Sequence, residues 1–274
     1  MSNLGIEFIS VFGMPPVEFV NLAADLGCSH ISTGLQNAPG RYNPYEYPPF
    51  SLKEDRALRR EMTAALNDRG VSISLGEGFA IWPNGNVRES YAADLEIMSE
   101  LGITRINSVS FETDRVRSFD QLGVLAEMAG AHGIETMIEF VPTFGIADLA
   151  TAQAAVNHVG RDNFKILIDT MHVGRSGARA QDIAALDPGV IGYVQLCDAL
   201  RVPKIPDYLE EAMYERMVPG EGELPLREML AALPRDRVIG LEVPQRSKVE
   251  AGIGQRERMA HCVEAARRLL ARLD

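Results

Sequence analysis

One unit recurs along this sequence: a helical stretch, a glycine, and then a short apolar run. Six copies read LAADLG-CSHIS, LNDRG-VSISL, MSELG-ITRINSV, AGAHG-IETMIEF, VNHVG-RDNFKILID and LDPG-VIGYVQL. Before several of the glycines, apolar residues recur at helical spacing, as at Leu58, Met62 and Leu66. Because Gly tolerates the left-handed conformation that ends many helices, we expect a helix to end at each of Gly27, Gly70, Gly102, Gly133, Gly160 and Gly189.

Two further apolar runs complete a set of eight expected strands. IEFISVF (6–12) precedes the first copy, and RVIGLEVP (237–244) follows the last. Eight alternating strand–helix units of this size predict a parallel (β/α)8 barrel, or TIM barrel, formed by residues 1–274 as a single domain. A doubly wound open sheet is the alternative. It normally has a glycine-rich nucleotide turn after an early strand, and GMPP (13–16) is not such a turn.

The acidic composition narrows the range of partners. Asp plus Glu number 38 against 27 for Lys plus Arg, which gives a net charge of −11 and no basic face for a nucleic-acid backbone. From the residues at its start we expect no signal peptide, and the sequence contains no run of about 18 apolar residues. Its three cysteines form no CxxC pair. We therefore expect a cytoplasmic protein with a small-molecule substrate, and neither nucleic acid nor membrane as a partner.

Oxygen-bearing side chains stand at the C-terminal ends of four successive expected strands. The strand sequences are MIEF, ILID, YVQL and GLEV. In a (β/α)8 barrel these strand ends form the active face, so side chains there can converge on one point. We expect convergence of Glu139, Asp169, Gln195 and Glu242.

A divalent metal ion accounts for this set of side chains. Three carboxylates that meet without a cation would repel one another and take up protons. Gln195 interrupts an apolar run, where an amide without partners costs about 1–3 kcal/mol, and it offers the ion a neutral oxygen. An all-oxygen set suits Mg²⁺ or Mn²⁺, with Co²⁺ as an alternative. Taken singly, each acid would be read as a loop cap or ion-pair partner, and Gln195 as an amide bonded to the backbone.

Four more residues are candidates for contacts with the substrate. His172 lies three residues after Asp169, and we expect it to transfer a proton or bind a hydroxyl group. Arg201 is expected to neutralise a substrate carboxylate or an enolate oxygen, with surface solvation as the alternative. Phe79 and Trp82, in the expected loop EGFAIWPNGN, either wall the substrate or pack against neighbouring loops. The Tyr- and Pro-rich segment 39–50 has the same two interpretations.

These motifs resemble the xylose isomerase-like TIM barrels of the sugar isomerase/epimerase superfamily over essentially the whole chain. The resemblance rests on MIEF, DTMH (169–172), QLCD (195–198), PGEGELPL (219–226) and LEVP (241–244). It implies a metal-dependent enzyme that removes a proton α to a carbonyl of a sugar or polyhydroxy ketone. In ketose 3-epimerases of the family, the glutamates matching Glu139 and Glu242 exchange this proton. The residues matching His172 and Arg201 hold substrate oxygens.

The sequence departs from the epimerases at the third ligand, where Gln195 replaces a histidine. A glutamine there is similar to bacterial 3-dehydroshikimate dehydratases, lyases that form protocatechuate and in which the histidine matching His172 is the base. Such an enzyme needs a cation for the substrate carboxylate, for which Arg201, Lys204 and Arg246 are candidates. Dehydration therefore stands beside isomerisation or epimerisation. The resemblance also implies a carbohydrate-like substrate.

Two other functional classes fit the sequence less well. A metal-dependent endonuclease on this fold would need further histidines, and the chain has five in total. A non-catalytic binding protein would not need the acidic set.

The insertion at 201–221 is expected to form either a lid or a contact in a homo-oligomer. Glu135 and Lys165, each four residues before a proposed ligand, should pair at the lower end of the barrel, because neither charge is stable when buried alone.

Overall fold

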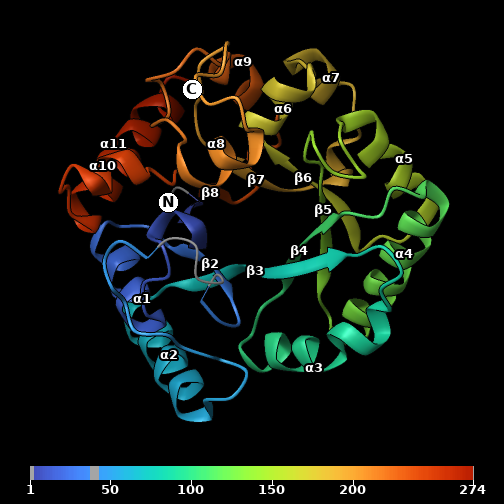
Figure 1. The fold of residues 1–274 in the computed structure, drawn as a ribbon, viewed down its shortest axis with the longest axis horizontal. Helices are drawn as coiled ribbons and strands as arrows, with labels where there is room; N and C mark the ends of the chain where they lie inside the picture. Colours follow the sequence, from blue (N-terminus) through green and yellow to red (C-terminus); the bar gives the residue numbers. More distant parts are fainter. Residues whose placement is uncertain (1–2, 38–42, 274) are drawn as a thin grey trace.

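A computed structural model describes residues 3–37 and 43–273 of the chain. Its parallel strands pair in sequence order and close into a barrel, with helices around it (Figure 1), which confirms the predicted fold class. The strands are β1 (Leu4–Ile6), β2 (His30–Gly34), β3 (Ser72–Ile81), β4 (Arg105–Ser110), β5 (Glu135–Glu139), β6 (Phe164–Asp169), β7 (Ile191–Leu196) and β8 (Ile239–Leu241).

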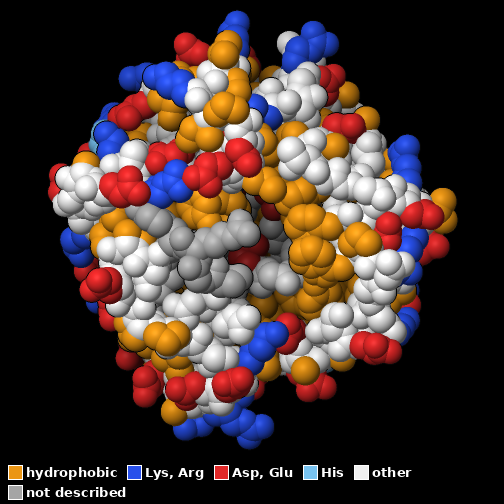
Figure 2. All heavy atoms as spheres, in the orientation of Figure 1, with side chains coloured by type: hydrophobic (Ala, Val, Ile, Leu, Met, Phe, Trp, Pro, Cys, Tyr) orange, Lys and Arg blue, Asp and Glu red, His pale blue; other side chains and the backbone are white. Residues whose placement is uncertain are grey.

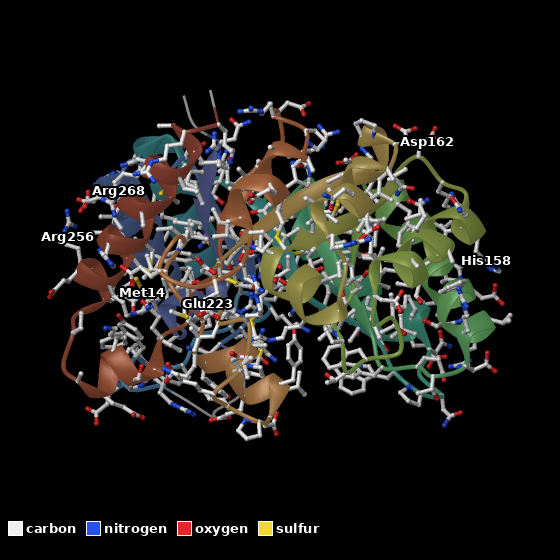
Figure 3. The ribbon with its side chains drawn as sticks, turned by 90° about the horizontal axis from the view of Figure 1, so that it is seen from above. Met14, His158, Asp162, Glu223, Arg256 and Arg268 are labelled. Carbon is white, nitrogen blue, oxygen red and sulfur yellow. The ribbon has the colours of Figure 1, made fainter. Side chains whose placement is uncertain are left out.

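The helices form the outer ring. They are α1 (Pro16–Asp25), α2 (Arg56–Arg69), α3 (Val87–Glu100), α4 (Arg115–Ala131), α5 (Leu149–Val159), α6 (Thr170–Ser176), α7 (Ala180–Ala184), α8 (Tyr208–Tyr214), α9 (Leu226–Ala231), α10 (Arg246–Glu250) and α11 (Gln255–Leu270). In Figure 3, Arg256 and Arg268 of α11 lie on the opposite side of the barrel from His158 of α5. No helix within the described residues is long and apolar enough to span a membrane.

Local sequence signals explain where the outer helices begin and end. Asp55, Asn86, Asp114 and Asp148 precede α2, α3, α4 and α5, and each accepts a hydrogen bond from a backbone N–H of the first turn. The expected left-handed conformation is confirmed at every predicted glycine except one. The exception is Gly189, which lies in a short 3-10 helix, η2 (Pro188–Val190), because the Asp187 side chain accepts its N–H and forms a tight turn.

Two strand boundaries differ from the prediction. β1 ends at Ile6 and gives way to a 3-10 helix, η1 (Phe8–Val11), because Ser32 Oγ accepts the N–H of Phe8 and draws the chain out of the sheet. β3 runs on to Ile81, so Phe79 lies in a strand and not in a loop. A register shift between Gly76 and Phe79 lets this strand continue along β4.

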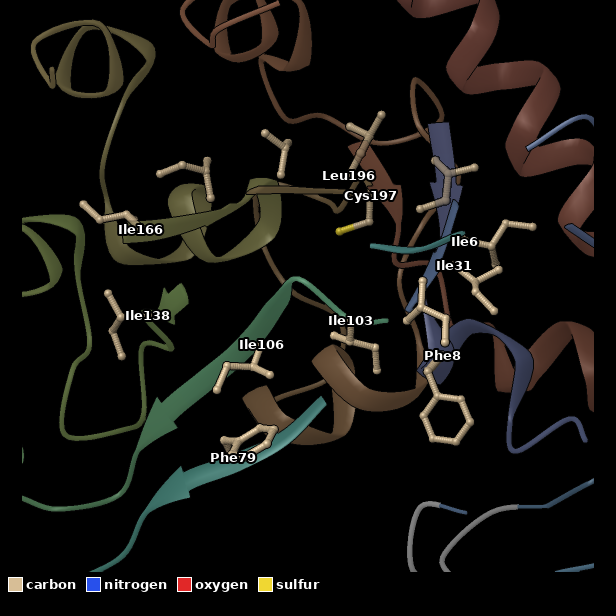
Figure 4. Packing of buried hydrophobic residues seen from close by; sticks show 14 of the residues in the cluster. Ile6, Phe8, Ile31, Phe79, Ile103, Ile106, Ile138, Ile166, Leu196 and Cys197 are labelled. Atoms are coloured by element: carbon tan, nitrogen blue, oxygen red, sulfur yellow. The ribbon is translucent and has the colours of Figure 1, made fainter. Parts of the chain in front are cut away.

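Side chains fill the barrel and the layer between barrel and helices. Figure 4 shows part of the larger cluster, in which Ile6, Ile31, Ile106 and Ile138 come from different strands. A smaller cluster consists of Leu75, Met137, Leu167 and Tyr193. The predicted pairing of Glu135 with Lys165 is confirmed, and Arg105 joins the same carboxylate at 3.1 Å.

Glycine at position 240 permits a close approach inside the barrel. Gly240 of β8 pairs with Gln195 of β7, and a Cβ atom at Gly240 would lie 1.5 Å from Glu7 Oε1. The Glu7 carboxylate cannot move aside freely, because Tyr193 donates a hydrogen bond to Oε1 at 2.7 Å and Ser74 lies 2.9 Å from the same tyrosine oxygen. The bare backbone of Gly240 is thus required for Glu7 to occupy its place.

We expect Gly240→Ala to lower the free energy of unfolding by about 2–4 kcal/mol, through steric overlap and loss of the Glu7–Tyr193 hydrogen bond. Gly123→Ala in α4 is the matched control, because its Cβ would meet Val159 at an ordinary 3.8 Å. This control should be neutral or stabilising by up to about 1 kcal/mol, since alanine favours a helix interior. Urea unfolding of both variants provides the measurement, and equal stability would contradict the packing of Glu7 over β8.

Candidate metal-binding active site

A pocket of about 710 Å³ opens at the C-terminal ends of the strands. Figure 2 shows a hollow in this face, with acidic side chains inside and hydrophobic side chains along one side. Among the predicted site residues, those that line the pocket are Phe79, Trp82, Glu139, His172 and Glu242. The pocket therefore lies on the face where barrel enzymes hold their substrates.

The ends of β5 and β6 place three predicted residues in contact. Asp169 ends β6 and caps α6, and its Oδ1 accepts the N–H groups of Met171 and His172 in the first turn of that helix. Glu139 ends β5, and its Oε1 lies 3.1 Å from His172 Nε2. Its other oxygen accepts a hydrogen bond from Asn107 of β4 at 2.6 Å. Each carboxylate is thereby held in one orientation.

Gln195 is fully buried at the end of β7, and only half of its amide is satisfied. Nε2 donates to Glu242 Oε1 at 3.0 Å. Oε1 has no hydrogen-bond partner among the described residues. A buried acceptor without a partner is costly, so this oxygen is suited to a ligand that the protein itself does not supply.

Arg216 is the arginine of this site, and sequence analysis missed it. Its guanidinium group is buried and contacts Asp169 Oδ2 and, at 2.8 Å, Glu242 Oε2. Arg216 Nε donates a hydrogen bond to the carbonyl of Ala212, and the Arg216 backbone N–H donates one to the carbonyl of Pro244. These two hydrogen bonds fix the residue in place. One signal was present: Arg216 lies three residues before the PGEGELPL motif.

The prediction that Arg201 binds the substrate is not supported, because Arg201 is exposed and its N–H is held by Glu223. After β7 the chain turns outward at Asp198, a buried residue that organises the return of the loop. Its carboxylate accepts backbone N–H groups from Ala199, Gly220, Gly222 and Leu224. Asp198 also pairs with Met217 in an isolated bridge, and this contact brings the preceding Arg216 over the strand ends. The path of the insertion therefore leaves Arg201 on the surface and returns Arg216 to the strand ends.

The insertion at 201–221 forms one wall of the pocket. Leu209 and Met213 of α8 line the pocket, and the Tyr208 hydroxyl contacts His172 Nδ1. The other two cations considered for a substrate carboxylate lie elsewhere. Lys204 is exposed and Arg246 is paired with Glu210, and neither lines the pocket.

Two further carboxylates lie beside the predicted set. Glu7 follows β1 and is fully buried, and Glu77 of β3 lines the pocket. Burial raises the pKa of Glu7 to about 7, against opposing hydrogen bonds. Burial, then repulsion from Glu7 and Glu139, raises the pKa of Glu77 well above the ordinary value. Both interrupt apolar runs in the sequence, as Gln195 does, and this was the available signal.

The two carboxylates that contact Arg216 have opposite pKa shifts. Burial opposes the ionisation of Asp169, but the charges of Arg216 and His172, with the backbone hydrogen bond from His172, hold its pKa below the usual range. Burial raises the pKa of Glu242 well above its usual value, although Arg216 acts in the other direction. The surroundings therefore favour the ionised form of Asp169, whereas burial favours the protonated form of Glu242.

The residues present fit a divalent ion. Ligand atoms of Glu139, Asp169 and His172 lie within 4.8 Å of one another, so His172 stands directly beside the predicted ligands. Glu242 falls in a second group with Glu7 and Glu77. The unpaired oxygen of Gln195 and the excess of carboxylates over cations favour a positively charged ligand.

Comparisons with known proteins agree with the barrel fold. Residues 20–269 match the family described as Xylose isomerase-like TIM barrel. An inosose isomerase of Bacillus subtilis (strain 168) is 26% identical over 149 residues, which are 51% of this chain and 52% of the relative. An inosose isomerase of Halalkalibacterium halodurans is 28% identical over 111 residues, 40% of this chain and 38% of the relative. The chain thus aligns with about half or less of each relative's length.

Solved structures share the fold at low identity. An IolI protein with a bound zinc atom has a TM-score of 0.82 at 16% identity and covers 100% of this chain and 99% of its own. A D-psicose 3-epimerase with D-fructose gives 0.72 at 18%, covering 99% and 97%. A probable 3-DHS dehydratase, AsbF of Bacillus anthracis, gives 0.72 at 16%, covering 94% and 98%. With the family match spanning most of the barrel, the chain belongs to the Xylose isomerase-like TIM barrel family.

Proposed function

We propose that this protein is a divalent-metal-dependent isomerase or epimerase that removes and returns a proton α to a carbonyl of a polyhydroxylated substrate. The observation that carries the proposal is the buried, unpaired oxygen of Gln195, whose amide contacts Glu242, while Glu242 and Glu139 line the pocket. The proposed ligands are Glu139, Asp169, Gln195 and Glu242, with Mg²⁺, Mn²⁺ or Co²⁺ as the ion. When bound, the ion supplies Lewis acidity, which makes the C–H beside the carbonyl more acidic.

Two carboxyl groups can share the proton transfer. Glu139 is held by Asn107 and His172 and is positioned to accept a proton from carbon. Glu242, which accepts a hydrogen bond from Gln195 and is paired with Arg216, is positioned to return the proton. The two reactions differ only in where the proton returns. In isomerisation another carbon receives it, and in epimerisation the opposite face of the same carbon does.

Arg216 and His172 supply positive charge and hydrogen bonds for substrate oxygens. The guanidinium group of Arg216 lines the pocket, so it can stabilise negative charge that develops on an oxygen during proton removal. His172 is oriented by Tyr208 at Nδ1, while Nε2 faces Glu139. Tyr208 thereby fixes the imidazole ring in the orientation that the proposed chemistry requires.

Dehydration of a carboxylated ring is the alternative, and the pocket gives it less support. Its described lining offers two permanent cations, Lys53 and Arg216. Lys53 is paired with Asp94 at 2.7 Å, and Arg216 with Asp169 and Glu242. Neither is left for a substrate carboxylate without giving up an existing ion pair. The names of the sequence relatives instead suggest inososes, which are cyclic polyhydroxy ketones, as the first substrates to test.

The proposal predicts that the enzyme, incubated with Mn²⁺ in D₂O, incorporates deuterium into an inosose or a ketose of a test panel. Glu242→Gln keeps the shape of the side chain but cannot accept a proton, so exchange should fall by at least about 100-fold. Glu264→Gln, at an exposed position, is the matched control and should retain full exchange. Mass spectrometry measures the label. Equal exchange in both variants would mean that Glu242 has no part in the reaction.

Gln195→Leu should weaken Mn²⁺ binding by about tenfold or more, because it removes the unpaired oxygen while keeping a similar volume. Gln195→Glu supplies an anionic oxygen at the same place and should bind the ion at least as tightly as the unchanged protein. Calorimetric titration with Mn²⁺ gives the affinities. If Gln195→Leu bound Mn²⁺ as well as the unchanged protein, Gln195 would not be a ligand.

Arg216→Met should tighten Mn²⁺ binding and lower turnover. An ion held by Asp169 and Glu242 must share them with the guanidinium group, and methionine removes this competitor while filling much of the same space. The same change removes the positive charge proposed to stabilise the reacting oxygen. Mn²⁺ titration and exchange kinetics test the two effects separately, and unchanged metal affinity would exclude the competition.

A further inference from the structure

Three aromatic rings form a continuous apolar surface at one side of the pocket, here called the aromatic wall: Trp82, Phe111 and Phe144. The rings of Trp82 and Phe111 are stacked, with centroids 4.3 Å apart and planes at 13°. Phe111 and Phe144 are 4.2 Å apart and tilted by 47°. All three line the pocket that contains the carboxylates.

The aromatic wall is held by the ends of neighbouring strands. Phe111 N–H donates to the carbonyl of Ile81 at 2.8 Å, which ties the end of β4 to the end of β3. Gly145 N–H donates to the carbonyl of Ser110 at 2.8 Å, which ties the segment after β5 to β4. A Cβ at Gly145 would lie 2.0 Å from a backbone oxygen, so this approach requires glycine. The rings therefore stand on a fixed backbone.

Trp82 is the exposed member of the aromatic wall, whereas Phe111 and Phe144 are half-buried. Trp82 is 54% exposed although Phe111 is stacked on it. The large hydrophobic residues that are exposed within the described chain are Trp82, Val116, Val202, Leu209 and Met213. Three of these five line this one pocket. Such a concentration of exposed apolar surface marks a binding site more often than a structural core.

The aromatic wall offers few hydrogen-bonding partners to the hydroxyl groups of a sugar. Phenylalanine rings have none, and tryptophan has a single indole N–H donor. The carboxylates, Asn107, His172 and Arg216 lie in the same pocket and suit a polyol. At about 710 Å³ the pocket is of the size that holds drug-sized ligands. One region thus matches hydroxyl groups, and another matches a flat apolar group.

We propose that the substrate is an aryl-substituted polyol, whose polyhydroxylated ring lies among the carboxylates and whose aromatic ring stacks on the aromatic wall. The proposal deepens the function proposed above and rests on it for the polyol end. A flat ring is the group that best covers an exposed indole face, because offset stacking places it in van der Waals contact over its whole area. An alkyl chain could also be buried against the aromatic wall, but it could not stack on the rings.

Trp82 is the only tryptophan of the chain, so intrinsic fluorescence reports directly on the aromatic wall. The full-length protein in Mg²⁺ would be titrated with phenyl β-D-glucopyranoside, hexyl β-D-glucopyranoside and D-glucose. We expect a saturable change in Trp82 emission with the phenyl glycoside and an affinity at least tenfold above that for the other two. Equal binding of the hexyl compound, or of glucose, would overturn the proposal.

Phe144→Ser tests the aromatic wall without touching the metal ligands. This variant should lose about tenfold in affinity for the phenyl glycoside and keep its affinity for Mg²⁺ and its melting temperature. Phe119→Ser is unsuitable as a control because Phe119 is buried in the core, whereas Val116→Ser, exposed on α4, should change nothing. If Phe144→Ser kept the same preference for the phenyl glycoside over the other two compounds, the proposal would be refuted. It would also be refuted if the change in Trp82 emission depended on protein concentration alone.

The two proposals can fail separately. Deuterium exchange into an unsubstituted inosose or ketose, without any preference for the phenyl glycoside, would support the reaction and overturn the aryl-substituted substrate. A strong phenyl preference that Phe144→Ser removes, without deuterium exchange into any carbonyl substrate, would support the aryl site and refute the proton-transfer function.

Discussion

Electrostatic compensation at the C-terminal end of the barrel is the constraint on which the site depends. Five carboxyl groups meet there in an apolar setting: Glu7, Glu77, Glu139, Asp169 and Glu242. Burial and mutual repulsion raise the pKa of several of them, so protons compensate part of the charge. Arg216 compensates another part through its contacts with two of the acids. A divalent ion would complete the balance, which is why the unpaired amide oxygen of Gln195 is informative.

The segment after β7 serves this balance from outside the barrel. Asp198 collects four backbone N–H groups and fixes the path of the PGEGEL loop. Because that path is fixed, the returning chain places Arg216 between two strand ends and Tyr208 against His172. A surface insertion thus supplies the cation and orients the imidazole, while the strands supply the carboxylates. The division is typical of barrels, in which a rigid core carries varied loops.

The pocket combines two environments with different physical demands. Its carboxylates and amides bind hydroxyl groups by directional hydrogen bonds, which select for the positions of oxygens. The aromatic wall attracts flat apolar groups through burial and stacking, which select for shape. A substrate that satisfies both would be held at two ends, and the reacting carbon would be positioned beside Glu139 and Glu242. The same separation predicts that changes at the wall affect affinity more than proton transfer.

The sequence determined the barrel fold and the end of the barrel at which the acidic side chains lie. Strand–helix alternation allows few topologies, and in a parallel barrel the last residues of consecutive strands must share one end, so Glu139, Asp169 and Gln195 could be placed together. Tertiary structure decided the rest. Which arginine reaches the site depends on where a long insertion returns, and neither its length nor its composition distinguishes Arg216 from Arg201. The aromatic wall joins residues that follow β3, β4 and β5 and are far apart in the chain, and they come into contact because these strands pair side by side in the sheet.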